Sequence, residues 1–160
     1  MSDYAKSIKD LPEVFQAVGI NKDSHKAQVL LLTCIDFRFF DEVSDVIRSR
    51  KLCGDYDHVI VAGAELGPQI DFGKEPKPHW KQFFLDHLRL AKELHEIERL
   101  LVLGHEDCGA YKRFLGPIEP DKEEEIHTMY LEKLKELIRQ EGIDVKVDGF
   151  MLRNTVDCRD

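Results

Sequence analysis

The sequence predicts an α/β fold, a three-layer domain in which a mainly parallel central β-sheet of about four to five strands is flanked by helices. Several apolar runs are continuous rather than alternating, which is typical of strands covered on both faces. Segments with apolar residues at helical spacing separate these runs, and strands that alternate with helices form parallel sheets with right-handed crossovers. No Pro/Gly/Ser-rich linker divides the 160 residues. We therefore expect a single domain, residues 1–160, with residues 1–24 as an N-terminal helical arm.

Four segments are predicted as strands. Residues 29–33 form an uninterrupted apolar run that places Cys34 directly after its carboxyl end. Residues 58–62 and 100–103 form two further apolar runs, and apolar residues alternate over residues 145–151. These lengths and patterns favour strands over helices.

Four segments are predicted as helices. A short helix occupies residues 10–19, where an aspartate and an early proline precede apolar residues at helical spacing. Residues 41–51 and 80–94 show amphipathic patterns, the second of them long. A last helix is expected over residues 121–142, with Glu124 in a capping position.

Composition and charge exclude several classes of partner. The formal net charge of -8 would repel the phosphates of nucleic acid. No stretch approaches the roughly 18 apolar residues that span a bilayer, and residues 1–10 lack the apolar segment of a secretory signal. We therefore expect a cytoplasmic protein with no membrane and no nucleic-acid partner. In a reducing compartment its four cysteines would serve a metal or the core rather than disulfides.

Two short motifs supply the ligand types of a metal centre. Cys34-x-Asp36-x-Arg38 follows the first predicted strand, and His105-x-x-Cys108 follows the third. The carboxyl ends of neighbouring parallel strands meet at one edge of a sheet, so the motifs would meet if these strands are neighbours. Two thiolates and one imidazole are a ligand set for Zn²⁺ that leaves the fourth tetrahedral position open. The motifs therefore predict a catalytic zinc site.

The role of Asp36 has two interpretations. It can bind zinc as the fourth ligand, which would make the site structural. Alternatively, it can accept a hydrogen bond from a zinc-bound hydroxide while Arg38 holds it by a bidentate pair. The second arrangement leaves the metal reactive, because zinc-bound water ionises far below bulk water. Single cysteines or histidines are often structural, so the metal hypothesis depends on the combination of the two motifs.

With their flanking residues, these motifs resemble the signature pair of the β-class carbonic anhydrases. The similar segments are Cys-Ile-Asp-Phe-Arg at residues 34–38 and Val-Leu-Gly-His-Glu-Asp-Cys-Gly-Ala at residues 102–110. The resemblance implies the same α/β architecture, Zn²⁺ held by one histidine and two cysteines, and an Asp–Arg dyad beside the metal. It also implies reversible hydration of carbon dioxide to bicarbonate by zinc-bound hydroxide. Family members build their active-site clefts at a dimer interface, so a homodimer or higher homo-oligomer is expected.

Three departures from the family pattern concern the substrate. Phe37 stands where the family usually has a serine, which adds bulk beside the metal. Ile60 and Val61 replace an Arg-Asn pair. His25 matches a glutamine that can donate to bound substrate, and it could be a substrate donor, a proton shuttle or a surface residue. The candidate substrate-binding set is His25, Phe37 and Gly63.

Other functions remain open. A related hydrolase of carbonyl sulfide or carbon disulfide would suit the apolar Phe37. A catalytically silent homologue could keep zinc for stability and serve in binding or regulation. The apolar residues around Trp80, Phe83 and Phe84 exceed what one small sheet face covers, which also favours a two-fold dimer.

Overall fold

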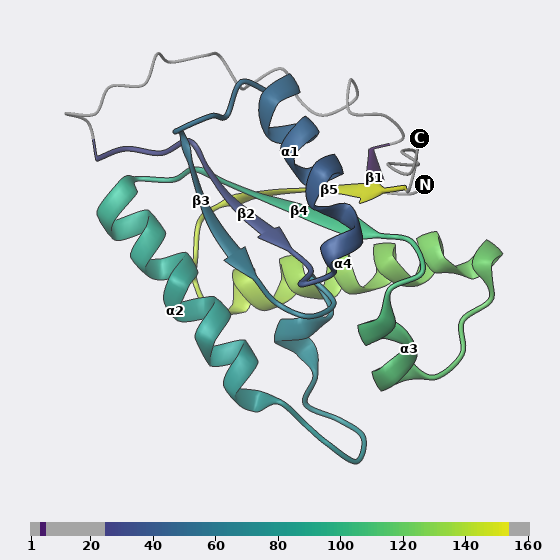
Figure 1. Cartoon of the computed structure of the whole chain (residues 1–160). Coiled ribbons are helices and arrows are strands. Elements are labelled where there is room, and N and C mark those ends of the chain that lie inside the picture. Colours follow the sequence, from purple (N-terminus) through teal and green to yellow (C-terminus); the bar gives the residue numbers. More distant parts are fainter. Residues whose placement is uncertain (1–3, 6–24, 154–160) are drawn as a thin grey trace.

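The computed structural model describes residues 4–5 and 25–153 of the chain, and in these residues it contains a five-stranded sheet. The strand order is β1-β5-β4-β2-β3, and every neighbouring pair is parallel (Figure 1). The strands are β1 (Tyr4–Ala5), β2 (Val29–Thr33), β3 (Tyr56–Ile60), β4 (Arg99–His105) and β5 (Lys146–Leu152). The predicted α/β fold with a parallel sheet is confirmed.

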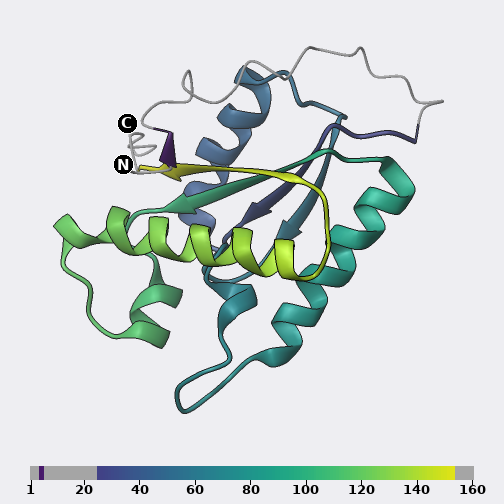
Figure 2. The same cartoon turned by 180° about the vertical axis from the view of Figure 1, so that it is seen from behind.

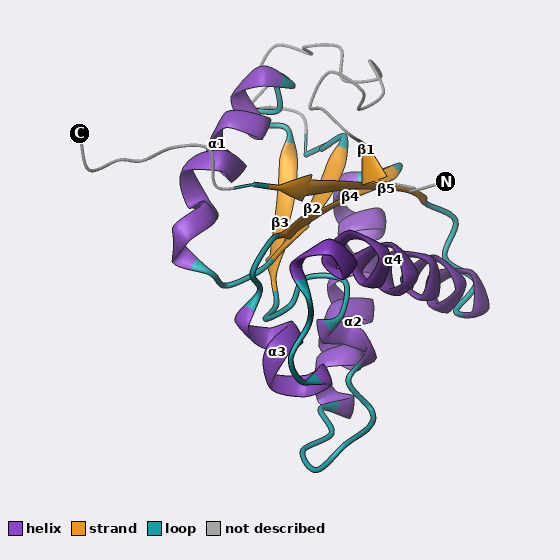
Figure 3. Cartoon of the chain, turned by 90° about the vertical axis from the view of Figure 1, so that its right-hand side faces the viewer, coloured by secondary structure: helices purple, strands orange, loops and turns teal. Residues whose placement is uncertain are grey.

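Helices cover both faces of this sheet. The described α-helices are α1 (Phe40–Ser49), α2 (Pro78–His95), α3 (Gly109–Leu115) and α4 (Glu123–Gln140). Figure 3 shows α1 on one side of the sheet and α2, α3 and α4 on the other, and Figure 2 shows α4 and α2 crossing that second face. Short 3-10 helices lie in the described loops: η2 (Phe37–Phe39), η3 (Gly67–Gln69) and η4 (Pro120–Lys122). None of the described helices is long and apolar enough to cross a bilayer.

The buried apolar residues of the described part of the chain form two clusters, one on each face of the sheet. Alternate residues of β2 enter different clusters, because successive side chains of a strand point to opposite faces. Leu30 and Leu32 belong to the cluster that includes α2 and α4, whereas Val29 and Leu31 belong to the cluster that includes α1. Burial on both faces explains why the central strands are continuous apolar runs.

The direct pairing of β2 with β4 positions the candidate site. The register aligns Val29 with Arg99 and Thr33 with Leu103, so the two strands end side by side. Cys34 directly follows β2, and His105 is the last residue of β4. The condition under which the two motifs would meet is therefore satisfied.

Some predicted elements differ from the structure. The second strand is β3, which ends two residues earlier than predicted because Val61 accepts a backbone bond from Ala64 in a tight turn. The last helix begins at Glu123, and Glu124 does not cap it: its carboxylate accepts a hydrogen bond from Arg153 at 3.0 Å.

Helix α3 and strand β1 were not predicted from the sequence. Helix α3 has seven residues, too few to show a convincing helical period in the sequence. Strand β1 has two, and its parallel pairing with β5 adds it to the edge of the sheet. The helix predicted for residues 10–19 lies outside the described residues.

Candidate metal centre

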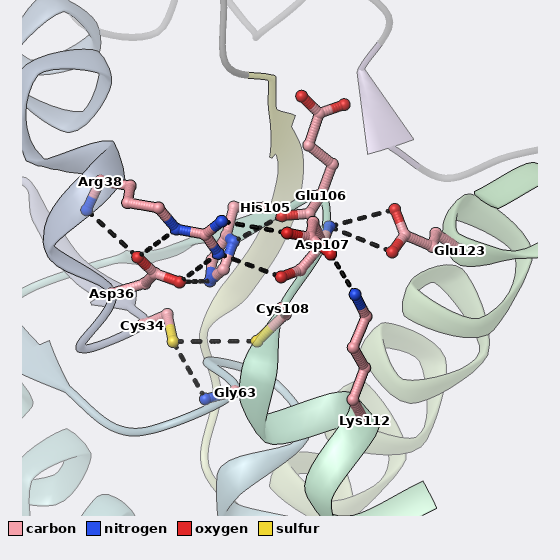
Figure 4. Close-up of polar contacts among 10 residues, drawn as sticks. All are labelled: Cys34, Asp36, Arg38, Gly63, His105, Glu106, Asp107, Cys108, Lys112 and Glu123. Atoms are coloured by element: carbon pink, nitrogen blue, oxygen red, sulfur yellow. Dashed lines mark hydrogen bonds and ion pairs between the residues drawn. The ribbon is translucent and has the colours of Figure 1, made fainter. Parts of the chain in front are cut away.

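Three predicted ligands converge at the carboxyl edge of the sheet. One ligand atom from each of Cys34, His105 and Cys108 can be chosen so that all lie within 4.8 Å of one another, and all three residues are buried. The two Sγ atoms are 3.9 Å apart (Figure 4). Cys34 comes from the end of β2, His105 from the end of β4, and Cys108 from the residue before α3. Strand pairing thus produces the cluster from motifs that are distant in the chain.

His105 presents a free lone pair to this cluster. Its Nδ1 lies 2.9 Å from the backbone carbonyl of Glu106, and a carbonyl can only accept, so Nδ1 carries the proton. In the neutral imidazole Nε2 is then the unprotonated nitrogen. This atom is buried and has no hydrogen-bond partner among the described residues. Phe39 packs on the ring at 4.4 Å between centroids and helps to fix its orientation.

The two thiols share a proton in the metal-free protein. The hydrogen bond with the Cys108 thiol lowers the pKa of Cys34 to about 4 even though burial opposes it, and the neighbouring His105 and the N–H of Gly63 act in the same direction. The same bond to the Cys34 thiolate, together with burial, raises the pKa of Cys108 above its ordinary value. A divalent cation removes this asymmetry, because metal-bound cysteine is a thiolate.

Backbone groups from the loop after β3 and from α3 influence the two thiols. The N–H of Gly63 donates to Cys34 Sγ at 3.2 Å, and the backbone of Ala110 and Tyr111, in the first turn of α3, opposes the rise in the pKa of Cys108. Gly63 has a φ of +81°, in the left-handed region, which turns this N–H toward the sulfur without the penalty that a side chain would add. Such bonds stabilise thiolate charge and orient metal ligands.

Asp36 and Arg38 form a bidentate pair beside the ligands. Arg38 Nε donates to Asp36 Oδ1 at 2.9 Å, and its terminal nitrogen donates to Oδ2 at 2.7 Å. These hydrogen bonds hold the pKa of Asp36 below its usual value, so the carboxylate is ionised at neutral pH. Asp36 Oδ2 lies 3.9 Å from His105 Nε2, which places the carboxylate at the edge of the metal cluster.

Asp107, which the motif analysis did not single out, is a second partner of Arg38. Its Oδ2 accepts from Arg38 at 3.0 Å, and its backbone carbonyl accepts from the same guanidinium at 3.1 Å. Asp107 also forms an ion pair with Lys112. Its position inside H-x-x-C was visible in the sequence, but its partner depends on how the two motifs approach each other.

The structure places the three substrate-binding candidates differently. Gly63 lies against Cys34, as described above. Phe37 is 79% exposed and lies between the two members of the Asp36–Arg38 pair in sequence. His25 is exposed and precedes β2, at the amino end of the sheet, so within one chain it is not brought to the cluster.

Comparison with known proteins identifies the family. The profile of a family described as "Putative carbonic anhydrase" matches residues 9–159. The chain belongs to this family. An uncharacterised protein of Rickettsia bellii is 31% identical to this carbonic anhydrase family member over 134 residues, which are 82% of this chain and 79% of the relative. A second, from Rickettsia conorii, is 30% identical over 134 residues, 82% of this chain and 70% of the relative.

Solved structures support the fold of this family member. Two variants of the β-carbonic anhydrase CafD of the filamentous fungus Aspergillus fumigatus superpose with TM-scores of 0.56 and 0.55. Each is 14% identical, and the match covers 94% of this chain and 92% or 93% of the fungal one. The fold is therefore that of a β-carbonic anhydrase.

Proposed function

We propose that this protein is a zinc-dependent carbonic anhydrase that interconverts carbon dioxide and bicarbonate. The observation that carries the proposal is the convergence of Cys34, His105 and Cys108 next to an Asp36–Arg38 pair. Membership of the carbonic anhydrase family supports it.

The residues fit a zinc ion by their chemistry. Two sulfurs and one imidazole nitrogen are ligands that suit zinc. Magnesium and calcium take oxygen ligands instead. The buried Nε2 of His105, with no hydrogen-bond partner among the described residues, is the atom that a metal would satisfy. Cys34 and Cys108 would supply the other two bonds. When bound, zinc would lower the pKa of a water molecule and so supply a nucleophile near neutral pH.

The surrounding residues would orient the reaction. Arg38 holds Asp36 as an ionised acceptor, so Asp36 Oδ2 can receive a hydrogen bond from a hydroxyl group at the edge of the cluster. That bond would direct the lone pairs of the oxygen toward the substrate carbon. If Asp36 itself bound the metal, the fourth position would be closed, and the pair with Arg38 counteracts this movement.

Stopped-flow measurement of carbon dioxide hydration by zinc-loaded protein tests the proposal. We expect saturable activity that is lost together with zinc in Cys108→Ser and His105→Ala, because two protein ligands hold zinc poorly. Cys53→Ser is the matched control, since Cys53 is an exposed free cysteine outside the cluster. Wild-type protein that loads no zinc would refute the metal centre. Zinc-loaded protein without activity would instead favour a silent, zinc-binding homologue with a binding or regulatory role.

A second candidate function is hydrolysis of carbonyl sulfide or carbon disulfide. The observation that favours it is the exposure of two apolar side chains in the motif itself: Ile35 is 61% and Phe37 is 79% exposed. Apolar surface beside the site suits a sulfur-bearing linear substrate better than a bicarbonate ion. Direct comparison of kcat/KM for carbon dioxide and carbon disulfide would decide between the two substrates.

Self-association and a cytoplasmic location complete the proposal. Phe84 is buried within the chain, and Trp80 packs against the same core, but Phe83 stays 43% exposed on α2. The exposed apolar residues of α2 are Phe83, Leu90 and Leu94. This surface supports a homodimer or higher homo-oligomer, which sedimentation equilibrium would detect. A reducing cytoplasm would keep Cys34 and Cys108 available for a metal.

A further inference from the structure

Glu65, Tyr111 and His127 form a buried polar cluster that the proposed reaction does not use. Glu65 is fully buried, and its Oε1 accepts hydrogen bonds from the Tyr111 hydroxyl at 2.9 Å and from His127 Nδ1 at 2.5 Å. The rings of Tyr111 and His127 stack, with centroids 3.9 Å apart and an interplanar angle of 21°. The three residues come from the loop after β3, from α3 and from α4.

Such a cluster is an unusual way to fill a core. A buried carboxylate carries a large desolvation cost that only good hydrogen-bond geometry offsets, and apolar residues of similar volume often stabilise a fold at least as well. What a hydrogen-bonded polar network adds is a defined geometry between the segments that it joins. The role of Glu65 therefore depends on which segments it holds together.

Glu65 joins the loop that contacts the Cys34 sulfur to the helix that begins directly after Cys108. Glu65 follows Gly63 by two residues, and the N–H of Gly63 donates to Cys34 Sγ (Figure 4). Tyr111 donates through its hydroxyl to Glu65 and lies in the first turn of α3, which begins directly after Cys108. Glu65 therefore links the loop that contacts the Cys34 sulfur to the helix that follows Cys108.

Two further contacts support this link. Gln69 Nε2 donates to the carbonyls of Glu65 at 2.6 Å and of Tyr130 at 2.8 Å, which ties the loop to α4. His127 bonds the same carboxylate from α4. Hydrogen bonds therefore tie the loop to α4 directly, and they tie α3 to α4 through Glu65. Helix α4 is one of the longest helices in the described part of the chain.

We infer that Glu65 is a positioning residue of the candidate metal centre, which acts through Tyr111 and His127 to keep the Gly63 N–H at Cys34 and the start of α3 at Cys108 in place for metal binding. The inference rests on the metal site of the proposed function. Glu65 does not touch the metal or the substrate. It presets the separation and orientation of the two thiolates, so that metal binding requires less rearrangement.

Cobalt titration monitored by absorption tests this role without any assay of activity. Glu65→Gln and Tyr111→Phe should each bind Co²⁺ about tenfold or more weakly than wild type, in the range expected for partners of metal ligands. The thiolate-to-cobalt charge-transfer band should shift as well. Tyr130→Phe is the matched control, because it removes one hydroxyl from the same core cluster and leaves Glu65 untouched. It should bind Co²⁺ within about twofold of wild type, whatever its thermal stability.

The outcomes separate this inference from the proposed function. If wild-type protein binds no Co²⁺, the metal site itself fails. If wild type binds but Glu65→Gln and Tyr111→Phe match it in affinity and spectrum, the positioning role is wrong and the metal site stands. An equal loss in Tyr130→Phe would assign the effect to general destabilisation and would also overturn the inference.

A measurement on wild-type protein decides the matter if the variants do not fold. Coupling between two sites is reciprocal, so metal loading should slow amide hydrogen exchange around His127, which does not contact a sulfur. We expect at least about tenfold slower exchange there on loading. Unchanged exchange around His127, with protection confined to the ligand segments, would overturn the inference.

Discussion

Arg38 donates to Asp107 at 3.0 Å and thereby joins the two motifs of the candidate metal centre to each other. Arg38 belongs to the motif after β2, whereas Asp107 lies between His105 and Cys108 in the motif after β4. The same guanidinium holds Asp36, so its position depends on two carboxylates. The hydrogen bond to Asp36 makes the largest contribution to the raised pKa of Arg38, and the hydrogen bond to Asp107 makes the second largest. The dyad is therefore fixed from both sides of the site.

Replacing Asp107 by asparagine should weaken catalysis without removing zinc. The variant loses the charge that holds Arg38 from the second motif, and the left-handed backbone at this position, with a φ of 56°, tolerates asparagine. We expect kcat/KM for carbon dioxide hydration to fall about tenfold, with unchanged zinc content by elemental analysis. Lys112→Met is the control, since it removes the other ion-pair partner of Asp107 and leaves Arg38 in place. Equal losses in both variants would contradict a role through Arg38.

Removing Arg38 should free Asp36 to bind the metal. In Arg38→Ala the carboxylate loses its bidentate partner and can move toward the ligand cluster, whose His105 Nε2 is 3.9 Å away. A carboxylate on the metal excludes water until hydroxide competes, so hydration activity should fall at least about tenfold at neutral pH and recover partly at alkaline pH. Arg48→Ala, on the exposed face of α1, should leave the pH profile unchanged. An unaltered profile in Arg38→Ala would refute this restraint on Asp36.

Zinc affinity should rise with pH. Bonding to the Cys34 thiolate and burial raise the pKa of Cys108, so this thiol keeps its proton in the metal-free protein. Burial works to lower the pKa of His105, but contact with the Cys34 thiolate outweighs it, and the net pKa is raised. Zinc binds only the deprotonated forms, so protons bound before loading are released on loading.

The sign of the effect follows from that release. Each proton displaced at a given pH makes zinc binding weaker by about tenfold for every pH unit of acidification. We expect at least this slope between about pH 8 and about pH 6, measured by competition with a chelator of known affinity. Cys34 adds little in this range, because its pKa of about 4 leaves it ionised. An affinity that does not change with pH would contradict the shared proton.

Substituting Gly63 should harm both the fold and the site. In Gly63→Ala the new Cβ would lie 3.2 Å from the Cβ of Ala110 and 3.3 Å from that of Leu66, at a φ of +81°. We expect a loss of about 1 to 2 kcal/mol in the free energy of unfolding from the backbone alone, and weaker zinc binding because the N–H of Gly63 moves from Cys34. Gly142→Ala is the matched control, with a positive φ and no atom within 4 Å of the new Cβ. It should lose stability but keep wild-type zinc affinity, as chemical denaturation and chelator competition would show.

Sequence analysis predicted the parts of this protein that depend on neighbouring residues. The continuous apolar runs before Cys34 and His105 are visible because strands buried on both faces need apolar side chains at every position. The long helix α2 was found from its amphipathic pattern. Helix α3 was missed because it is short, and the capping role predicted for Glu124 failed because its carboxylate bonds Arg153 instead.

The candidate site divides in the same way. Residue chemistry and motif spacing were enough to propose Cys34, His105 and Cys108 as ligands and Asp36 with Arg38 as a pair. They could not show that Phe39 stacks on His105, since that contact depends on how η2 returns over the end of β4. Nor could they show that His25 lies at the amino end of the sheet and away from the cluster within one chain.

The sequence by itself determined the candidate ligands and the strand ends that carry them, because residue identity, polarity and periodicity are local properties of a chain. Only the tertiary structure decided which residues support those candidates. The bond from Arg38 to Asp107 and the meeting of Glu65 with Tyr111 and His127 join segments that are distant in the chain. Such contacts are set by strand register and helix packing, which bring together side chains whose local sequence gives no sign of a partner.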